Sequence, residues 1–159
     1  PEWVEKVITQ TIPTISPKKV ILGIPTYGYI FEISWKDGVT TYKRVGATTY
    51  PKAIELAQKV GATSTRNSAG ELSFVYATST SYTVSANLTF SISSTQPTAL
   101  ATQTNPAAVM RLVSFSDASS MMDKINLAKK YKLKGVYFFK ADGDIDPTFW
   151  DEFNNNEKN

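Results

Sequence analysis

The sequence predicts a mixed fold in which an α/β layer at both ends of the chain flanks an antiparallel α+β segment. Near the N-terminus an amphipathic helix pattern leads into a short apolar run without alternation. The middle of the chain shows hairpin patterns, and a strand–helix–strand pattern returns near the C-terminus. With 159 residues, 42% of them hydrophobic, the chain is long enough for an ordinary domain with its own core.

The first predicted element is a helix over residues 2–12, which Pro13 ends. Its apolar residues recur at helical spacing: Trp3, Val4, Val7, Ile8 and Ile12. The run VILGIP, residues 20–25, is apolar and bounded by Lys and Pro. We expect a strand that is covered on both faces, as in parallel α/β sheets.

Aromatic and β-branched residues over 29–45 surround the pair Asp37-Gly38, which is a hairpin signal. A helix is expected next, with Thr48 or Thr49 at its N-cap and Pro51 in its first turn. Gly61 should end it. Its inner face should carry Ile54, Ala57 and Val60.

A second hairpin is expected over residues 63–78, turning at 67–70. Residues 82–93 alternate as a half-buried strand does, and residues 93–108, rich in Ser, Thr, Ala and Pro, predict a surface loop. The middle of the chain is therefore predicted to be antiparallel α+β.

Residues 109–139 predict a strand, a helix and a buried strand, with Ser116 or Asp117 capping the helix. The inner face of that helix is expected to hold Met121, Met122, Ile125, Ala128 and Tyr131. The rule for right-handed crossovers makes VILGIP and GVYFF neighbouring parallel strands, with the α+β segment inserted between them.

Composition excludes several classes of function. The net charge is +3, but Lys and Arg are scattered, so we expect no nucleic-acid partner. The chain has neither Cys nor His, which excludes thiolate nucleophiles, Cys/His zinc sites and imidazole bases, and we expect no cofactor or metal. No apolar run approaches the roughly 20 residues that span a bilayer. The abrupt start at Pro1 indicates a fragment boundary.

Three stretches together resemble glycoside hydrolase family 18, the chitinase-like family. KVILGIPTYGYIF is similar to the seventh barrel strand, which leads into an insertion domain. RLVSFSDASSMMDKINLAKKYKLKGVYFFKADGDIDPTFW is similar to the end of the same barrel, and TTYPKAIELAQKVGA to a helix that bacterial cell-wall and spore-cortex members carry in the insertion.

The resemblance implies the C-terminal fragment of a TIM (β/α)8 barrel that carries an antiparallel α+β insertion domain. Residues 1–28 would supply strand seven, 29–110 the insertion, and 111–159 the strand-eight region and terminal helices. A complete barrel needs about 250 residues, so the first six units would lie upstream. The family's catalytic signature, Asp-Gly-x-Asp-x-Asp-x-Glu on strand four, does not occur in this sequence.

The segment DGDID places Asp142, Asp144 and Asp146 at alternate positions, which suggests a catalytic cluster, a calcium loop or a polar strand end. No Glu follows where the signature requires it. Pro147 stands where an EF-hand needs Gly, and Phe153 stands where it needs a bidentate Glu. The sequence favours a structural role, with an aspartate capping a short helix that starts near Pro147; we predict no catalytic residue in this chain.

Candidate sugar-binding residues follow the predicted barrel strands, because barrel sites lie at the C-terminal strand ends. Tyr27 matches the family pattern, Phe139 stands where many members have Trp, and Tyr29 stands where chitinases often have Arg. Trp35, near the hairpin turn, is a fourth candidate for a cleft wall. Simple core packing is the alternative for each of them.

The resemblance implies that the parent protein acts on an N-acetylglucosamine-containing polysaccharide, chitin or peptidoglycan. This chain would contribute cleft surface without the catalytic acid, and export to the cell envelope would follow from such a substrate. A non-catalytic carbohydrate-binding or cell-envelope module and an α+β scaffold without sugar function are the alternatives. Exposed edges of the two barrel strands would either repack against the insertion or support self-association.

Overall fold

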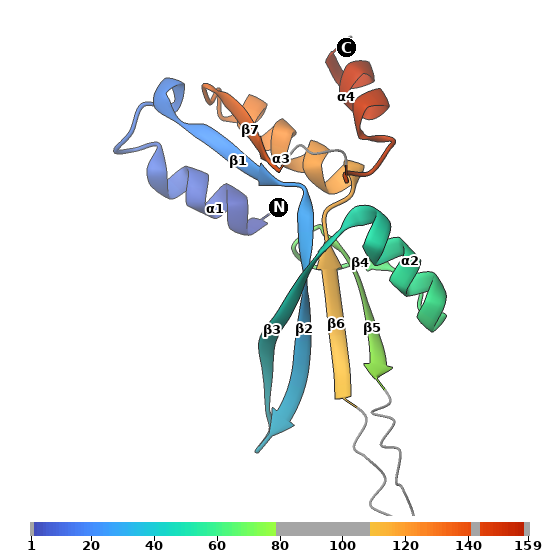
Figure 1. Ribbon diagram of the computed structural model, residues 1–159. Coiled ribbons are helices and arrows are strands. Elements are labelled where there is room, and N and C mark those ends of the chain that lie inside the picture. Colours follow the sequence, from blue (N-terminus) through green and yellow to red (C-terminus); the bar gives the residue numbers. More distant parts are fainter. Residues whose placement is uncertain (1, 79–108, 141–143, 158–159) are drawn as a thin grey trace, which may run out of the picture.

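The structure, a computed structural model, describes residues 2–78, 109–140 and 144–157. In chain order its elements are α1 (Glu2–Thr11), the 3₁₀ turn η1 (Pro17–Lys19), β1 (Ile21–Pro25), β2 (Tyr27–Lys36), β3 (Val39–Thr49), α2 (Tyr50–Val60), β4 (Thr65–Arg66), β5 (Leu72–Thr78), β6 (Val109–Phe115), α3 (Ala118–Lys130), β7 (Gly135–Phe139) and α4 (Phe149–Glu157). Within these residues the strands form a two-stranded sheet, β1-β7, and a five-stranded sheet ordered β3-β2-β6-β5-β4 (Figure 1).

The two ends of the chain meet in the parallel sheet of β1 and β7. The pairing runs from Ile21 opposite Gly135 to Pro25 opposite Phe139, which confirms the predicted parallel pair. One face of this sheet packs on α3 and α4 through a buried cluster. Its fully buried members are Ile24, Ala118, Met121, Met122, Ile125 and Phe149. The predicted inner face of α3 is thus confirmed except at Tyr131, which is half-buried.

The expectation that β1 is covered on both faces is wrong. Successive side chains of a strand point to opposite faces, and only one face of this sheet meets helices. On the other face Ile21 is 53% exposed, Tyr137 57% and Phe139 52%. The predicted apolar face of α1 is also largely open, because Trp3 is 74% exposed and Ile8 is the buried residue of that helix.

Hairpins build most of the five-stranded sheet, as predicted. Asp37 and Gly38 take φ values of 52° and 79° in the two-residue turn between β2 and β3, a conformation that suits Asp-Gly. The second hairpin joins β4 to β5, and the side chain of Asn67 accepts hydrogen bonds from the backbone of Ala69 and Glu71 in its turn. The strand expected over 82–93 and the loop over 93–108 lie outside the described residues.

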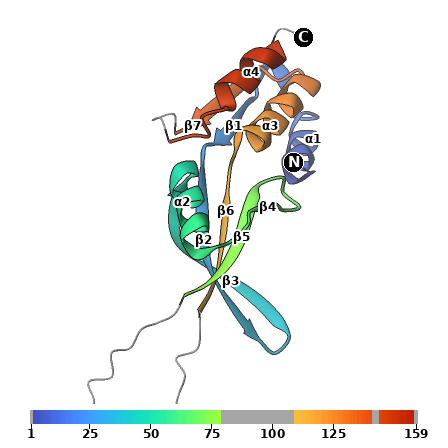
Figure 2. The same cartoon turned by 90° about the vertical axis from the view of Figure 1, so that its right-hand side faces the viewer.

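The strand β6 lies in the middle of the five-stranded sheet, between β2 and β5 (Figure 2). The predicted domain boundaries at 28/29 and 110/111 therefore fall inside β2 and β6, each of which belongs to this sheet along its length. The division of the chain into barrel and insertion parts stays a prediction.

One face of the five-stranded sheet is covered by α2. Ala53 and Ala57 are buried against Phe74, Val113 and Phe115. Gly61 ends the helix in the left-handed conformation with φ 65°, as predicted. Val60, expected on the inner face, is the last residue of α2 and is 38% exposed, whereas Ala53, one turn before Ala57, is buried.

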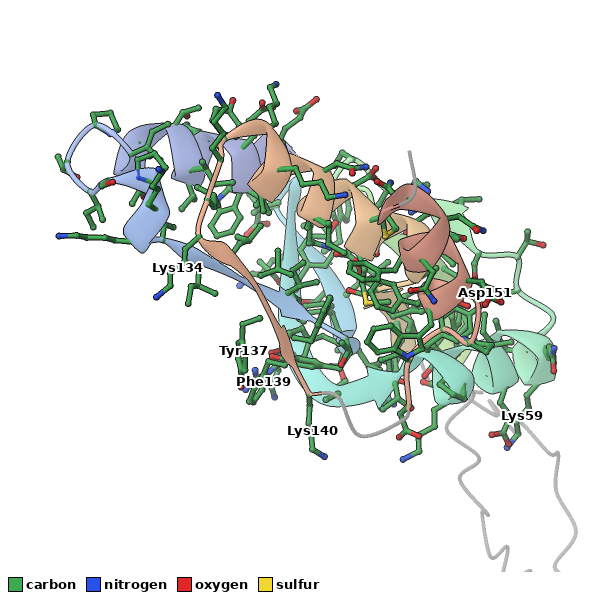
Figure 3. The ribbon with its side chains drawn as sticks, turned by 90° about the horizontal axis from the view of Figure 1, so that it is seen from above. Lys59, Lys134, Tyr137, Phe139, Lys140 and Asp151 are labelled. Carbon is green, nitrogen blue, oxygen red and sulfur yellow. The ribbon has the colours of Figure 1, made fainter. Side chains whose placement is uncertain are left out.

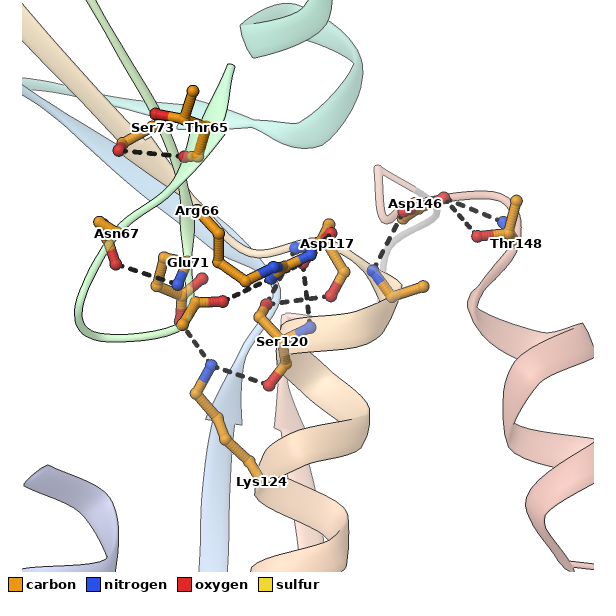
Figure 4. Close-up of polar contacts among 12 residues, drawn as sticks. Thr65, Arg66, Asn67, Glu71, Ser73, Asp117, Ser120, Lys124, Asp146 and Thr148 are labelled. Atoms are coloured by element: carbon orange, nitrogen blue, oxygen red, sulfur yellow. Dashed lines mark hydrogen bonds and ion pairs between the residues drawn. The ribbon is translucent and has the colours of Figure 1, made fainter. Parts of the chain in front are cut away.

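The two sheets are held together by a polar network around the start of α3 (Figure 4). Asp117 caps α3 by accepting from the Ser120 backbone at 2.9 Å, and Arg66 of β4 donates two hydrogen bonds to the same carboxylate, at 3.1 and 2.7 Å. Lys124, which is 6% exposed, pairs with Glu71 and donates to the Ser120 carbonyl. These contacts join the second hairpin to the helix that covers β1 and β7.

No helix in the described part of the chain is long and apolar enough to cross a membrane.

Candidate functional site

The candidate site lies where the chain passes from the parallel sheet into the five-stranded sheet. Thr26 separates β1 from β2 and is 5% exposed. Its hydroxyl donates to the Lys140 carbonyl at 2.7 Å and accepts from the Lys140 backbone at 3.1 Å, while its own N–H donates to the Phe139 carbonyl. These bonds tie together the C-terminal ends of β1 and β7 and fix Tyr27 beside Phe139.

Three aromatic rings gather at this junction. The ring centroids of Tyr27 and Phe139 lie 6.0 Å apart at an interplanar angle of 74°, and those of Tyr27 and Tyr29 lie 5.4 Å apart at 85°. Both are edge-to-face arrangements of the kind that aromatic pairs favour. Phe139 is 52% exposed, so the cluster presents apolar ring surface to solvent.

The two tyrosines are also joined through their hydroxyls. Tyr29 Oη donates to Tyr27 Oη at 3.3 Å. This hydrogen bond, followed by burial, raises the pKa of Tyr27, and the nearby positive charge of Arg44 opposes the rise. The Tyr27 phenol is therefore protonated at neutral pH and serves as a hydrogen-bond group, not as a base. The Arg44 guanidinium lies 5.1 Å from the centre of the Tyr29 ring, a cation–π contact.

A cavity of about 310 Å³ opens beside Tyr27 and Phe139. Its wall combines the end of β3, the first turn of α2 and the residues that follow β7. The lining residues are Thr26, Tyr27, Ala47, Thr48, Thr49, Lys52, Phe139, Lys140 and Asp144. Figure 3 shows Phe139 and Lys140 side by side at the end of β7, and Lys59 well away from them at the last turn of α2. Apolar ring surface beside a few polar groups is the usual make-up of a small-ligand pocket.

Trp35 does not join this cluster. It lies on the same face of β2 as Tyr27, but eight residues further along, which is about 26 Å in an extended strand. Trp35 is 72% exposed near the tip of the β2–β3 hairpin, which projects away from the two-stranded sheet (Figure 1). The structure thus brings Tyr27, Tyr29 and Phe139 together and leaves Trp35 apart.

The carboxylates of DGDID do not form a cluster in the described residues. Asp146 is 6% exposed and accepts from the Ala118 backbone at 3.0 Å and from the Thr148 backbone and hydroxyl at 3.0 and 2.9 Å. It therefore secures the start of α3 and the turn before α4, a structural role of the predicted kind, and α4 begins at Phe149, two residues after Pro147. Asp144 is exposed and lines the cavity; Asp142 lies outside the described residues.

No group of three or more potential metal-ligating side chains occurs among the residues that the structure describes. The DGDID segment thus offers no assembled cation site in the described positions, Asp144 and Asp146.

The sequence-based prediction missed several polar residues of the candidate site. Lys140 directly follows β7, so the rule that places barrel sites after strand ends was enough to predict it. Lys52 lies in the first turn of a helix from a distant part of the chain, and no local pattern marks it. Arg44 was also missed, because only the pairing of β3 with β2 brings it over Tyr29.

Exposed rings at the ends of parallel strands, beside a cavity with hydroxyl and charged groups, offer both apolar and polar contacts to a ligand. The comparisons with known proteins give the family. Residues 2–144 match the family model for glycosyl hydrolases family 18, and the chain belongs to that family. No curated protein matches the chain by sequence.

The chain is also similar in fold to several solved structures. The C-terminal domain of a predicted chitinase from Desulfitobacterium hafniense DCB-2 is 26% identical, with a TM-score of 0.60, over 87% of this chain and 34% of that one. The spore cortex-lytic enzyme SleL of Bacillus megaterium QM B1551 is 23% identical, with a TM-score of 0.63, over 96% of this chain and 29% of that one. A chitinase from Chromobacterium violaceum ATCC 12472 is 19% identical, with a TM-score of 0.64, over 99% of this chain and 39% of that one.

The chain therefore spans about a third of the length of these solved structures. Its match covers nearly all of its own residues and only part of theirs.

Proposed function

We propose that this chain forms the C-terminal part of a TIM-barrel glycosidase, with β1 and β7 as its seventh and eighth barrel strands. The support is the parallel β1–β7 pair, with α3 and α4 on one face and exposed side chains on the other. In a barrel the helices cover the outer face, and the inner face is completed by other strands. The five-stranded sheet with α2 corresponds to the insertion domain.

The proposed substrate is an N-acetylglucosamine-containing polysaccharide, chitin or peptidoglycan. The observation that carries this proposal is the cluster of Tyr27, Tyr29 and Phe139 at the C-terminal ends of β1 and β7, beside the cavity. A sugar ring has apolar C–H faces that stack on aromatic rings, while hydroxyl groups at its edge form hydrogen bonds. Tyr27 and Phe139 would supply the stacking surface, and the phenols of Tyr27 and Tyr29 would bind at the edge.

The chain would bind sugar without cleaving it. A glycosidase acid is a carboxyl group whose raised pKa keeps it protonated beside the scissile oxygen. In the described residues, Asp144 is exposed and Asp146 already accepts three hydrogen bonds, so neither has the surroundings of such an acid. The proposed role is the wall of a substrate cleft whose catalytic segment is not in this sequence.

The second candidate is a non-catalytic carbohydrate-binding or cell-envelope module with the same aromatic cluster. An intact Asp-x-Asp-x-Glu run in the parent protein would favour the enzyme, and its loss would favour the binding module. Either role places the parent outside the cell or at its envelope, where such polymers occur. No cofactor is required by either one.

The open face of the β1–β7 sheet gives a further consequence of this proposal. Ile21, Tyr137 and Phe139 remain about half exposed, so the insertion does not cover the face. We expect the isolated chain to self-associate through it, since contiguous exposed apolar surface favours association. Sedimentation velocity on the chain and on Tyr137→Lys tests this: a concentration-dependent dimer that the substitution abolishes is expected, and a monomer at all concentrations contradicts it.

The binding proposal is tested by titrating N-acetylglucosamine oligosaccharides into the chain and three variants by calorimetry. Tyr27→Ala and Phe139→Ala should each weaken binding about tenfold, the effect of losing an aromatic contact of about 1.5 kcal/mol. Trp35→Ala is the matched control, since it removes an exposed aromatic residue from the same strand outside the cluster, and it should leave the affinity unchanged. Equal losses in all three variants would refute this placement of the site.

A further inference from the structure

The cavity beside Tyr27 and Phe139 carries charges that a neutral polysaccharide does not need. Lys52 and Lys140 line it from opposite parts of the chain, the first turn of α2 and the end of β7. Asp144, a carboxylate, lines it as well. Among the described lining residues, two side chains are therefore cationic and one is anionic.

The polar atoms around these lysines also favour an acceptor-rich ligand. The cavity wall includes the hydroxyl residues Thr26, Thr48 and Thr49. Thr49 occupies the N-cap of α2 but makes no side-chain capping bond, and its buried Oγ1 has no hydrogen-bond partner among the described residues. The first turn of α2, in which Pro51 has no N–H, therefore places the positive end of a helix dipole near Lys52.

The size of the cavity limits what can enter it. A volume of about 310 Å³ is at the lower end of the range for small-ligand sites, so it suits one sugar unit and its substituents. Tyr27, Phe139 and Lys140 line the cavity from the start of β2 and the end of β7, whereas Lys52 lines it from the start of α2. A ring stacked on the aromatic residues would thus have Lys140 next to it and Lys52 across the cavity, both within the lining that a substituent can contact.

We propose that this cavity selects a sugar unit that carries a carboxylate substituent, and that Lys52 and Lys140 bind this carboxylate. The inference rests on the proposed sugar-binding function and narrows its substrate. Among N-acetylglucosamine-containing polymers, the ether-linked carboxylate of the muramic acid units in peptidoglycan has this chemistry, whereas chitin is neutral. Lysine is suited to such a contact, because its ammonium group is a mobile point charge that forms charge-assisted hydrogen bonds with carboxylates.

The test compares two oligosaccharides of equal length by calorimetry: a neutral N-acetylglucosamine tetramer and a tetramer in which N-acetylglucosamine alternates with N-acetylmuramic acid. The chain should bind the acidic tetramer on the order of tenfold more tightly at low salt, and the preference should fall as salt screens the charges. Lys52→Gln and Lys140→Gln should each reduce the preference, and the double variant should bind both tetramers with equal affinity.

Two further variants separate a local effect from a general one. Lys59→Gln removes a lysine from the last turn of the same helix, outside the cavity lining, and should leave the preference unchanged. Asp144→Asn removes the opposing charge and should strengthen binding of the acidic tetramer alone. Equal affinity of the chain for both tetramers, or an equal effect of Lys59→Gln, would overturn the carboxylate proposal while leaving sugar binding intact. Failure to bind either tetramer would refute the proposed function itself, and the inference with it.

Discussion

Gly28, between the two clustered tyrosines, allows β2 to lie against β6 at the point where the two sheets meet. A Cβ atom added there would overlap the Ser114 carbonyl oxygen and the Phe115 Cβ, and would lie 2.5 Å from the Phe115 Cα. Real Cβ atoms do not approach other heavy atoms this closely, and none of these three atoms is the mobile end of a side chain. Gly28→Ala must therefore displace β2 from β6, and with it Tyr27 and Tyr29.

The stability change of Gly28→Ala combines two opposing contributions. Overpacking of this kind destabilises by about 1–3 kcal/mol, and replacing Gly with Ala stabilises by about 0.4–1 kcal/mol because it lowers the entropy of the unfolded chain. The net loss of about 1–2 kcal/mol corresponds to a melting temperature lower by about 2–8 °C for a chain of this size. Displacement of the rings should also weaken sugar binding, as the stacking surface is no longer in place.

The matched control is Gly46→Ala on the neighbouring strand β3, because a Cβ added at Gly46 meets no atom within 4 Å. It should be neutral or stabilise the chain by a few tenths of a kcal/mol. Thermal unfolding followed by circular dichroism measures both variants. Equal melting temperatures for Gly28→Ala and Gly46→Ala would refute the inference that β2 and β6 are packed this closely.

The polar network at the start of α3 gives the remaining predictions. Asp117→Ala removes a helix cap and the carboxylate that Arg66 binds, and should cost about 2 kcal/mol in urea unfolding, whereas Asp151→Ala, at an exposed position of α4, should cost less than about 0.5 kcal/mol. Burial raises the pKa of Asp117, but the hydrogen bonds from Arg66 and Ser120 outweigh it and hold the pKa below its usual value. The stabilisation by this carboxylate is therefore complete above about pH 5 and is lost as the pH falls toward the lowered pKa. The free energies of unfolding of the chain and of Asp117→Asn should thus converge in acid. A difference that stays constant with pH would contradict this role of Asp117. Lys124→Met leaves the Glu71 carboxylate without its cation and should cost about 3 kcal/mol, and adding Glu71→Leu should recover part of the loss, which a double-mutant cycle measures.

Local patterns predicted most of the elements because the physical causes are themselves local. Asp37-Gly38 adopts the positive φ values that a two-residue hairpin requires, and Gly61 ends α2 for the same conformational reason. Asp117 and Ser120 form a capping box, which can be recognised in a sequence because its two residues are only three positions apart. The parallel pairing of β1 with β7 followed from the crossover rule, although the strands are more than a hundred residues apart.

Burial and the polar part of the candidate site were harder to predict, because they depend on which elements become neighbours. VILGIP looks like a strand covered on both faces, yet helices meet only one face of its two-stranded sheet. Lys124 looks like a surface lysine and is buried, because Glu71 from a distant hairpin neutralises it. Trp35 shares a strand face with Tyr27, and only the length of the strand shows that it lies too far away to join the cluster.

The central claim is that this chain binds N-acetylglucosamine oligosaccharides at Tyr27 and Phe139 and has no catalytic acid of its own. The most direct test incubates the chain with a fluorogenic N-acetylglucosamine oligosaccharide and follows binding and release of the fluorophore in the same sample. The account predicts saturable binding that Tyr27→Ala weakens, with no release above the uncatalysed rate. Fluorophore release by the chain alone, abolished by Asp144→Asn, would contradict the claim and assign catalysis to the DGDID segment.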